Sequence, residues 1–123
     1  MGLFSRNKKS STNQLDWIEV NSIDELNQAI SSTEEKPGLF FKHSTRCSIS
    51  SMALRRFESK WEKTDNCTLY FINLIAHGDV SHALSEKANI THQSPQAILL
   101  QNEKAIYDAS HNGISAGDVQ QLI

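Results

Sequence analysis

A chain of 123 residues, 38% hydrophobic and 21% charged, provides one ordinary hydrophobic core and has room for one domain. Its net charge of −2 argues against a dedicated nucleic-acid binder, which would normally carry a basic surface. No stretch is long and apolar enough to span a bilayer, so we expect no integral membrane association.

The first 14 residues are polar, basic and low in complexity, and we interpret them as a flexible tail before a single domain at residues 15–123. They lack the apolar segment of a secretory signal peptide, and Arg6 stands where a myristoylation motif needs Ser or Thr. Weak electrostatic contact with a membrane surface is the second interpretation of this tail. Because only Cys47 and Cys67 are present and no export signal precedes them, we expect a cytoplasmic protein without a structural disulfide.

The first predicted elements are a short edge strand at 15–20 and a helix that begins after Ser22. Ser22 is a suitable N-cap, and Glu25 completes a capping box with it. The inner face of this helix carries Ile23, Leu26 and Ile30. Lys36-Pro37-Gly38 then interrupts the helical pattern, and the apolar run at 38–43 predicts a buried central strand.

A polar turn at 44–48 leads into a second helix that extends to about Lys63. Its apolar residues recur at three- and four-residue steps, which predicts a buried face of Ile49, Met52, Ala53, Phe57 and Trp61. Residues 67–75 form the most strand-like run of the chain. A third helix follows at 79–88, with Val80, Ala83 and Leu84 facing inward.

The last elements are a strand at 96–100, a turn, a strand at 105–108 and a helix from about Ser115 to the end. We expect this helix to bury Val119, Leu122 and Ile123. The element order is therefore β-α-β-α-β-α-β-β-α. Alternating strands and helices favour parallel pairing, and the closing hairpin adds antiparallel strands. The order predicts an α/β protein with a mixed parallel/antiparallel sheet flanked by helices, which is the thioredoxin-like fold.

Cys47 is the candidate nucleophile, because it lies where the second predicted helix begins. The unpaired amides and the dipole of a helix start favour a negative charge, and the thiolate is the reactive form in disulfide exchange. Arg46 adds a nearby cation, and Ser48 and Ser50 add hydroxyls that can donate to the sulfur. The alternative is a capping or core cysteine without chemistry. Cysteine is a poor cap, however, and the polar neighbours argue against deep burial.

A dithiol enzyme would carry its second cysteine three residues after the first, where this chain has Ser50. Cys67 comes after the second helix, which spans roughly 24 Å if it is regular, whereas a disulfide needs α-carbons within about 7 Å of each other. We therefore predict a monothiol cycle in which a soluble thiol resolves the mixed disulfide. Cys67 is then a core or edge residue, and a role in linking a dimer stays open.

Pro95 allows two interpretations. It either simply opens its strand, or it forms a cis Ser94–Pro95 bond opposite Cys47 that exposes the Ser94 backbone to an extended thiol or peptide. His43, four residues before Cys47, could tune the thiol or donate to a substrate, and His92 is comparable; a purely structural histidine is as consistent with either position. The remaining histidines, His77, His82 and His111, show no metal-ligand spacing, so we predict no metal site.

Two segments give the chain a specific resemblance. The run Phe41-Lys42-His43-Ser44-Thr45-Arg46-Cys47-Ser48-Ile49-Ser50, followed downstream by His92-Gln93-Ser94-Pro95-Gln96 and Ala109-Ser110-His111, resembles the monothiol bacilliredoxin family. The resemblance implies a bacterial cytosolic oxidoreductase without a bound cofactor, with bacillithiol as its thiol co-substrate. Cys47 would remove bacillithiol from mixed disulfides with client proteins, and a second bacillithiol would regenerate it.

The resemblance also implies the surroundings of the site. We expect the nucleophile to lie among Arg46, Ser48, Ile49, Ser50 and His43, and the substrate to contact Thr45, His92, Ser94 and Pro95. One position departs from the family, which commonly has proline directly after the cysteine where this chain has Ser48. Proline stiffens the first helical turn, so we expect its loss to alter thiol acidity or specificity and to leave the nucleophile in place.

Two other function classes fit the same residues. A thioredoxin-like adaptor would use the surface around Cys47 and Pro95 to hold a partner without turnover. A redox sensor would let the small thiol cap Cys47 without transfer to or from clients.

Overall fold

The computed structural model describes residues 15–123, so the tail predicted at 1–14 lies outside the described residues. In chain order the elements are β2 (Ile18–Glu19), α1 (Ile23–Ser32), β3 (Gly38–His43), α2 (Ser48–Lys60), β4 (Thr68–Asn73), α3 (Gly78–Ala88), β5 (Gln96–Gln101), β6 (Lys104–Ser110), the 3₁₀-helix η1 (His111–Gly113) and α4 (Ala116–Gln120). The predicted alternation of strands and helices is confirmed. Capping of α1 by Ser22, whose side chain accepts from the amide of Glu25, is confirmed as well.

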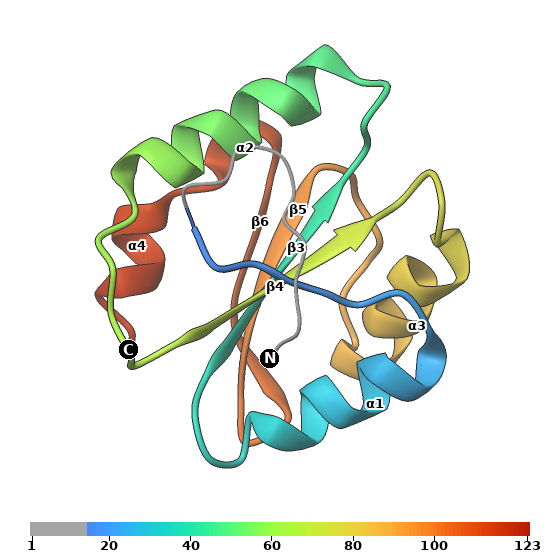
Figure 1. Ribbon diagram of the computed structural model, residues 1–123, viewed down its shortest axis with the longest axis vertical. Helices are drawn as coiled ribbons and strands as arrows, with labels where there is room; N and C mark the ends of the chain where they lie inside the picture. The colour runs from blue at the N-terminus through green and yellow to red at the C-terminus, as the bar shows by residue number, and fades with distance from the viewer. Residues whose placement is uncertain (1–14) are drawn as a thin grey trace.

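The five strands of the described chain form one sheet in the order β2-β4-β3-β5-β6. The central strand β3 runs parallel to β4 and antiparallel to β5, so the sheet is mixed, as predicted. Helices α2 and α4 cover one face, and α1 and α3 cover the other (Figure 1). Because β3 and β4 are parallel, they end at the same edge of the sheet, and β5 begins at that edge.

Helices on both faces explain why every residue of β3 is buried. Alternate side chains of the strand enter two separate cores. Leu39 and Phe41 pack with Phe57 of α2, whereas Phe40 packs with Tyr70 and with Leu84 of α3. This alternation also decides on which side of the sheet the polar residues at the end of β3 lie.

The predicted inner face of α2 is partly wrong. Ile49 and Met52 are 53% and 59% exposed. The residues that α2 buries are Ser50, Ala53, Leu54, Phe57 and Glu58. Two of these are polar and find partners that the local pattern does not show: Trp17 Nε1 donates to Glu58 Oε2 at 2.8 Å, and Ser50 bonds to residues at the end of β3.

The ends of several elements also differ from the prediction. The first strand comprises only Ile18–Glu19, and α2 ends at Lys60. Helix α4 is a short helix that ends at Gln120, which leaves Leu122 46% exposed. Ile23, which is also predicted to face inward, is exposed, whereas Ala83 is half-buried and packs against the core, as predicted.

Gly38, the first residue of β3, allows a close approach by Tyr70 of the neighbouring strand. A Cβ at Gly38 would lie 2.9 Å from Tyr70 Cε2 and 3.2 Å from Thr33 Cγ2. The Tyr70 ring cannot easily give way, because it stacks on Phe40 with ring centroids 4.7 Å apart. We therefore expect Gly38→Ala to lower the free energy of unfolding by about 1–3 kcal/mol, measured by urea denaturation.

Gly78 is the matched control for this substitution. It begins α3, and a Cβ there would have no neighbour within 4 Å. Gly78→Ala should be neutral or stabilise by up to ~1 kcal/mol. Equal denaturation midpoints for the two variants would contradict the proposed crowding at Gly38.

Candidate functional site

The candidate site lies at the sheet edge where β3 and β4 end. In the β3–β5 ladder Lys42 pairs with Gln96, so Pro95, the residue before Gln96, lies at the same edge as His43, the last residue of β3. A turn follows β3, in which the amide of Cys47 donates to the carbonyl of Ser44 at 3.2 Å. The register of the sheet thus brings Cys47 and the Ser94–Pro95 segment to one edge.

Cys47 is the N-cap residue of α2. Its backbone is extended (φ −116°, ψ 120°), and its carbonyl accepts from the amide of Ser51 at 3.1 Å, which begins the helix. The sulfur makes no capping hydrogen bond. The side chain is half-buried and the thiol is free, and its neighbours Thr45, Arg46, Ser48 and Ile49 are exposed. The geometry thus leaves the sulfur at a helix start, where the unpaired amides favour an anion.

Ser50, at the position of a second cysteine, is fully buried. Its Oγ lies 2.7 Å from Nδ1 of His43 and accepts from the amide of Ser44 at 3.0 Å. The hydroxyl therefore connects the end of β3 to the first turn of α2. We expected it to donate to the Cys47 sulfur; the structure directs it to His43 and Ser44 instead.

His43 is a buried histidine that supports this turn. Its ring centroid lies 5.5 Å from that of Phe71, and burial lowers the pKa of the imidazole below its usual value. The ring is therefore neutral near pH 7 and does not place a positive charge beside the thiol. Within residues 15–123 its ring contacts Ser50 and Phe71, so its predicted role in tuning the thiol or donating to a substrate stays a prediction.

The peptide bond between Ser94 and Pro95 is cis. Pro95 is buried, and its carbonyl accepts from the amide of His111 at 3.1 Å. Ser94 is half-buried, and its backbone makes no hydrogen bond to any residue of the described range 15–123. Its N–H and C=O are thus free to pair with an extended chain.

Comparison with known proteins shows to which family this chain belongs. The family described as monothiol bacilliredoxin BrxC matches residues 18–119. The chain belongs to the monothiol bacilliredoxin family. A solved structure of a candidate oxidoreductase with a thioredoxin fold is 30% identical, with a TM-score of 0.73 over 85% of this chain and 90% of that one.

More distant structures share the fold alone. The thioredoxin of Malassezia sympodialis is 14% identical, with a TM-score of 0.67 over 94% of this chain and 95% of its own. The thioredoxin of Schistosoma mansoni is 19% identical, with a TM-score of 0.64 over 89% and 96%. The predicted thioredoxin-like fold is confirmed, and family and fold together support a thiol redox function.

His92 lies in a second polar cluster on the other face of the sheet from His43. Its Nδ1 is 3.1 Å from Nζ of Lys42, and its ring centroid lies 4.2 Å from that of His82. Lys42 and Gln96 complete this cluster, and the sequence reasoning missed both. The available signal was a lysine inside a run that the sequence predicts to be a buried strand. Contact of Thr45 or His92 with a substrate stays a prediction.

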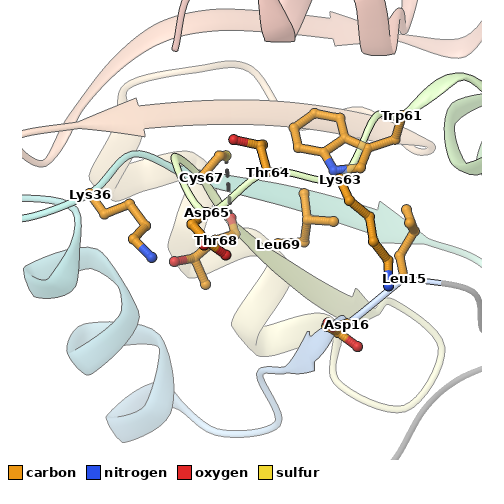
Figure 2. Close-up of a pocket in the computed structure, with 10 residues that line it drawn as sticks. All are labelled: Leu15, Asp16, Lys36, Trp61, Lys63, Thr64, Asp65, Cys67, Thr68 and Leu69. Carbon is orange, nitrogen blue, oxygen red and sulfur yellow. Dashed lines mark hydrogen bonds between the residues drawn. The ribbon is translucent and has the colours of Figure 1, made fainter.

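Cys67 lies just before β4, at the sheet edge opposite to Cys47. It lines a pocket of about 250 Å³ together with Thr64 and Asp65. Figure 2 shows these side chains. The residue is 7% exposed, its Sγ donates to the carbonyl of Thr68 at 3.6 Å, and burial raises the pKa of the thiol to about 11. Cys67 is therefore a protonated core thiol near pH 7. The accessible thiol of this bacilliredoxin is Cys47.

Within residues 15–123 no three His, Cys, Asp or Glu side chains gather as they would around a metal ion. None of the helices in this range has the length and hydropathy needed to cross a bilayer.

The two thiols should differ in reactivity. With iodoacetamide at pH 8 we expect alkylation of Cys47 to be faster than that of Cys67 by more than about tenfold, because burial raises the pKa of the Cys67 thiol and hides its sulfur, whereas Cys47 is only half-buried. Peptide mapping of the native protein over time measures the two rates. In urea the rates should converge, and equal rates in the native protein would contradict the assignment.

Proposed function

We propose that this chain is a monothiol oxidoreductase that removes bacillithiol from mixed disulfides with client proteins, with Cys47 as nucleophile. Two side chains at the start of α2 support this proposal most directly. Cys47 has a free, half-buried thiol, and Ser50 has a buried hydroxyl where a dithiol enzyme has its resolving thiol. Membership of the bacilliredoxin family supports bacillithiol as the thiol co-substrate. The reaction needs no bound cofactor. A reducing cytosol, which keeps Cys47 as a free thiol, is part of the proposal.

The reaction balances with thiols alone. The Cys47 thiolate attacks the bacillithiol sulfur of the mixed disulfide, the bond between that sulfur and the client sulfur breaks, and the client leaves as a thiolate that takes a proton from water. Cys47 now carries bacillithiol through a new disulfide bond. The thiolate of a second bacillithiol attacks the sulfur of the bound one, which releases bacillithiol disulfide and regenerates Cys47.

The surface around Cys47 suits a protein client. Ile49 and Met52 lie three residues apart on the first turns of α2 and are more than half exposed. Ile75, which follows the end of β4 at the same sheet edge, is 47% exposed. Apolar side chains exposed around a reactive group favour docking of a partner chain, and the free backbone of Ser94 offers it hydrogen bonds.

Intact-mass spectrometry of the protein mixed with a bacillithiol-modified client tests this function. We expect the adduct to move onto wild-type protein and onto Cys67→Ser, with release of the client thiol. Cys47→Ser should take no adduct, because no other accessible thiolate can attack.

Other outcomes identify the alternatives. An unmodified wild-type protein with the client still capped would contradict the proposal and favour an adaptor. Capping of Cys47 by bacillithiol disulfide, without release of any client thiol, would instead indicate a redox sensor.

A further inference from the structure

Lys42 is a fully buried lysine, 0% exposed, next to the last residue of β3. Side chains alternate along a strand, so Lys42 points to the face covered by α1 and α3, whereas His43 points to α2. Their contacts agree, because Lys42 reaches Ser85 of α3 and His43 reaches Ser50 of α2. Lys42 therefore lies beside the Cys47 site without facing it.

The ammonium group of Lys42 has two polar neighbours. Its Nζ donates to Ser85 Oγ and lies 3.1 Å from His92 Nδ1. An ammonium group can only donate, so Nδ1 of His92 accepts and the imidazole is neutral. Burial lowers the pKa of Lys42 to about 8, and burial together with Lys42 and His82 lowers the pKa of His92. Near pH 7 both groups are thus in the states that this hydrogen bond requires.

Gln96 holds the residues on either side of His92. It is the cross-strand partner of Lys42 in β5, and it is 1% exposed. Its Nε2 donates to the carbonyl of Thr91 at 3.0 Å, and its Oε1 accepts from the amide of Gln93 at 3.3 Å. Lys42 and Gln96 together therefore contact all three residues of the segment 91–93, which leads directly into Ser94 and Pro95.

Stability alone does not explain this pair. An ammonium group buried without a counter-charge costs free energy, and a well-packed apolar side chain of similar volume is often more stable at such a site. Among the described residues, no carboxylate forms an ion pair with Lys42. What the two side chains provide is a defined path for the segment 91–93.

We infer that Lys42 and Gln96 are positioning residues that hold the segment 91–93, so that the free backbone of Ser94 meets a client chain bound at Cys47. The inference rests on the proposed function, since it assumes that the client pairs with Ser94. It separates two reactions of the same thiol. Exchange with a protein client depends on the segment, whereas exchange with a small disulfide depends on Cys47 alone.

Lys42→Met tests the inference, with Lys87→Met as its control. Lys87 is an exposed lysine of α3, so its substitution removes a positive charge without touching the segment. For Lys42→Met we expect the KM for a bacillithiol-modified client to rise about tenfold, as expected for loss of a hydrogen bond from a charged group. Its kcat with the client should stay within twofold of wild type. Its rate of thiol–disulfide exchange with 2-hydroxyethyl disulfide should do the same.

Gln96→Leu, with Gln101→Leu as control, provides a second variant if the lysine substitution prevents folding. Gln101 ends the same strand and is exposed. Gln96→Leu should raise the KM for the client in the same way, and Gln101→Leu should leave it unchanged. Unchanged KM values in both buried variants would overturn the inference. An equal loss of activity with the client and with the small disulfide would also overturn the inference, because that result would place the effect on Cys47.

Amide hydrogen exchange measures the segment without any client, so it still tests the inference if the proposed function fails. Lys42→Met and Gln96→Leu should speed exchange at the amide of Gln93, which donates to Gln96 Oε1, while the control variants leave it unchanged. Unaltered exchange in the buried variants would refute positioning by this pair. Failure of wild-type protein to react with any client would refute the proposed function alone.

Discussion

The site depends on one buried contact, between the hydroxyl of Ser50 and the ring of His43. The hydroxyl also accepts from the amide of Ser44, so a single oxygen joins the end of β3, the turn after it and the first turn of α2. These bonds hold the turn that carries Cys47. They also occupy the position from which a second thiol would attack, and so the contact that shapes the site leaves Cys47 without a local partner.

The last two residues of β3 serve opposite faces of the sheet. His43 supports the nucleophile through Ser50, and Lys42 supports the segment before Pro95 through His92. Because neighbouring side chains of a strand point to opposite sides, one short stretch of backbone can hold both halves of a site. Thioredoxin-like topology makes this possible, since it brings the end of β3 and the beginning of β5 to the same edge.

The order of elements, the mixed sheet and the position of Cys47 at a helix start could be predicted from the sequence, because they follow from hydrophobic periodicity and local capping. The buried face of α2 could not. Ile49 and Met52 fit the helical period as well as the true core residues do, and Ser50 and Glu58 are polar. Their burial depends on His43 and Trp17, which lie elsewhere in the chain and become visible only in three dimensions.

The roles of Lys42 and Gln96 were hidden for the same reason. A lysine in a strand predicted to be buried marks its own position, but only the register of β3 with β5 shows that Lys42 and Gln96 are neighbours. The segment 91–93 has no regular secondary structure of its own, so no periodic pattern predicts how it is held.

Substitution of Ser50 by cysteine tests most directly whether this residue makes the chain a monothiol protein. Wild-type protein and Ser50→Cys, both in a Cys67→Ser background, would be treated with bacillithiol disulfide and weighed intact. The account predicts that wild type keeps one bacillithiol adduct, whereas Ser50→Cys releases it and loses its two thiol hydrogens to an internal disulfide. A Ser50→Cys protein that keeps its adduct as stably as wild type would contradict the account.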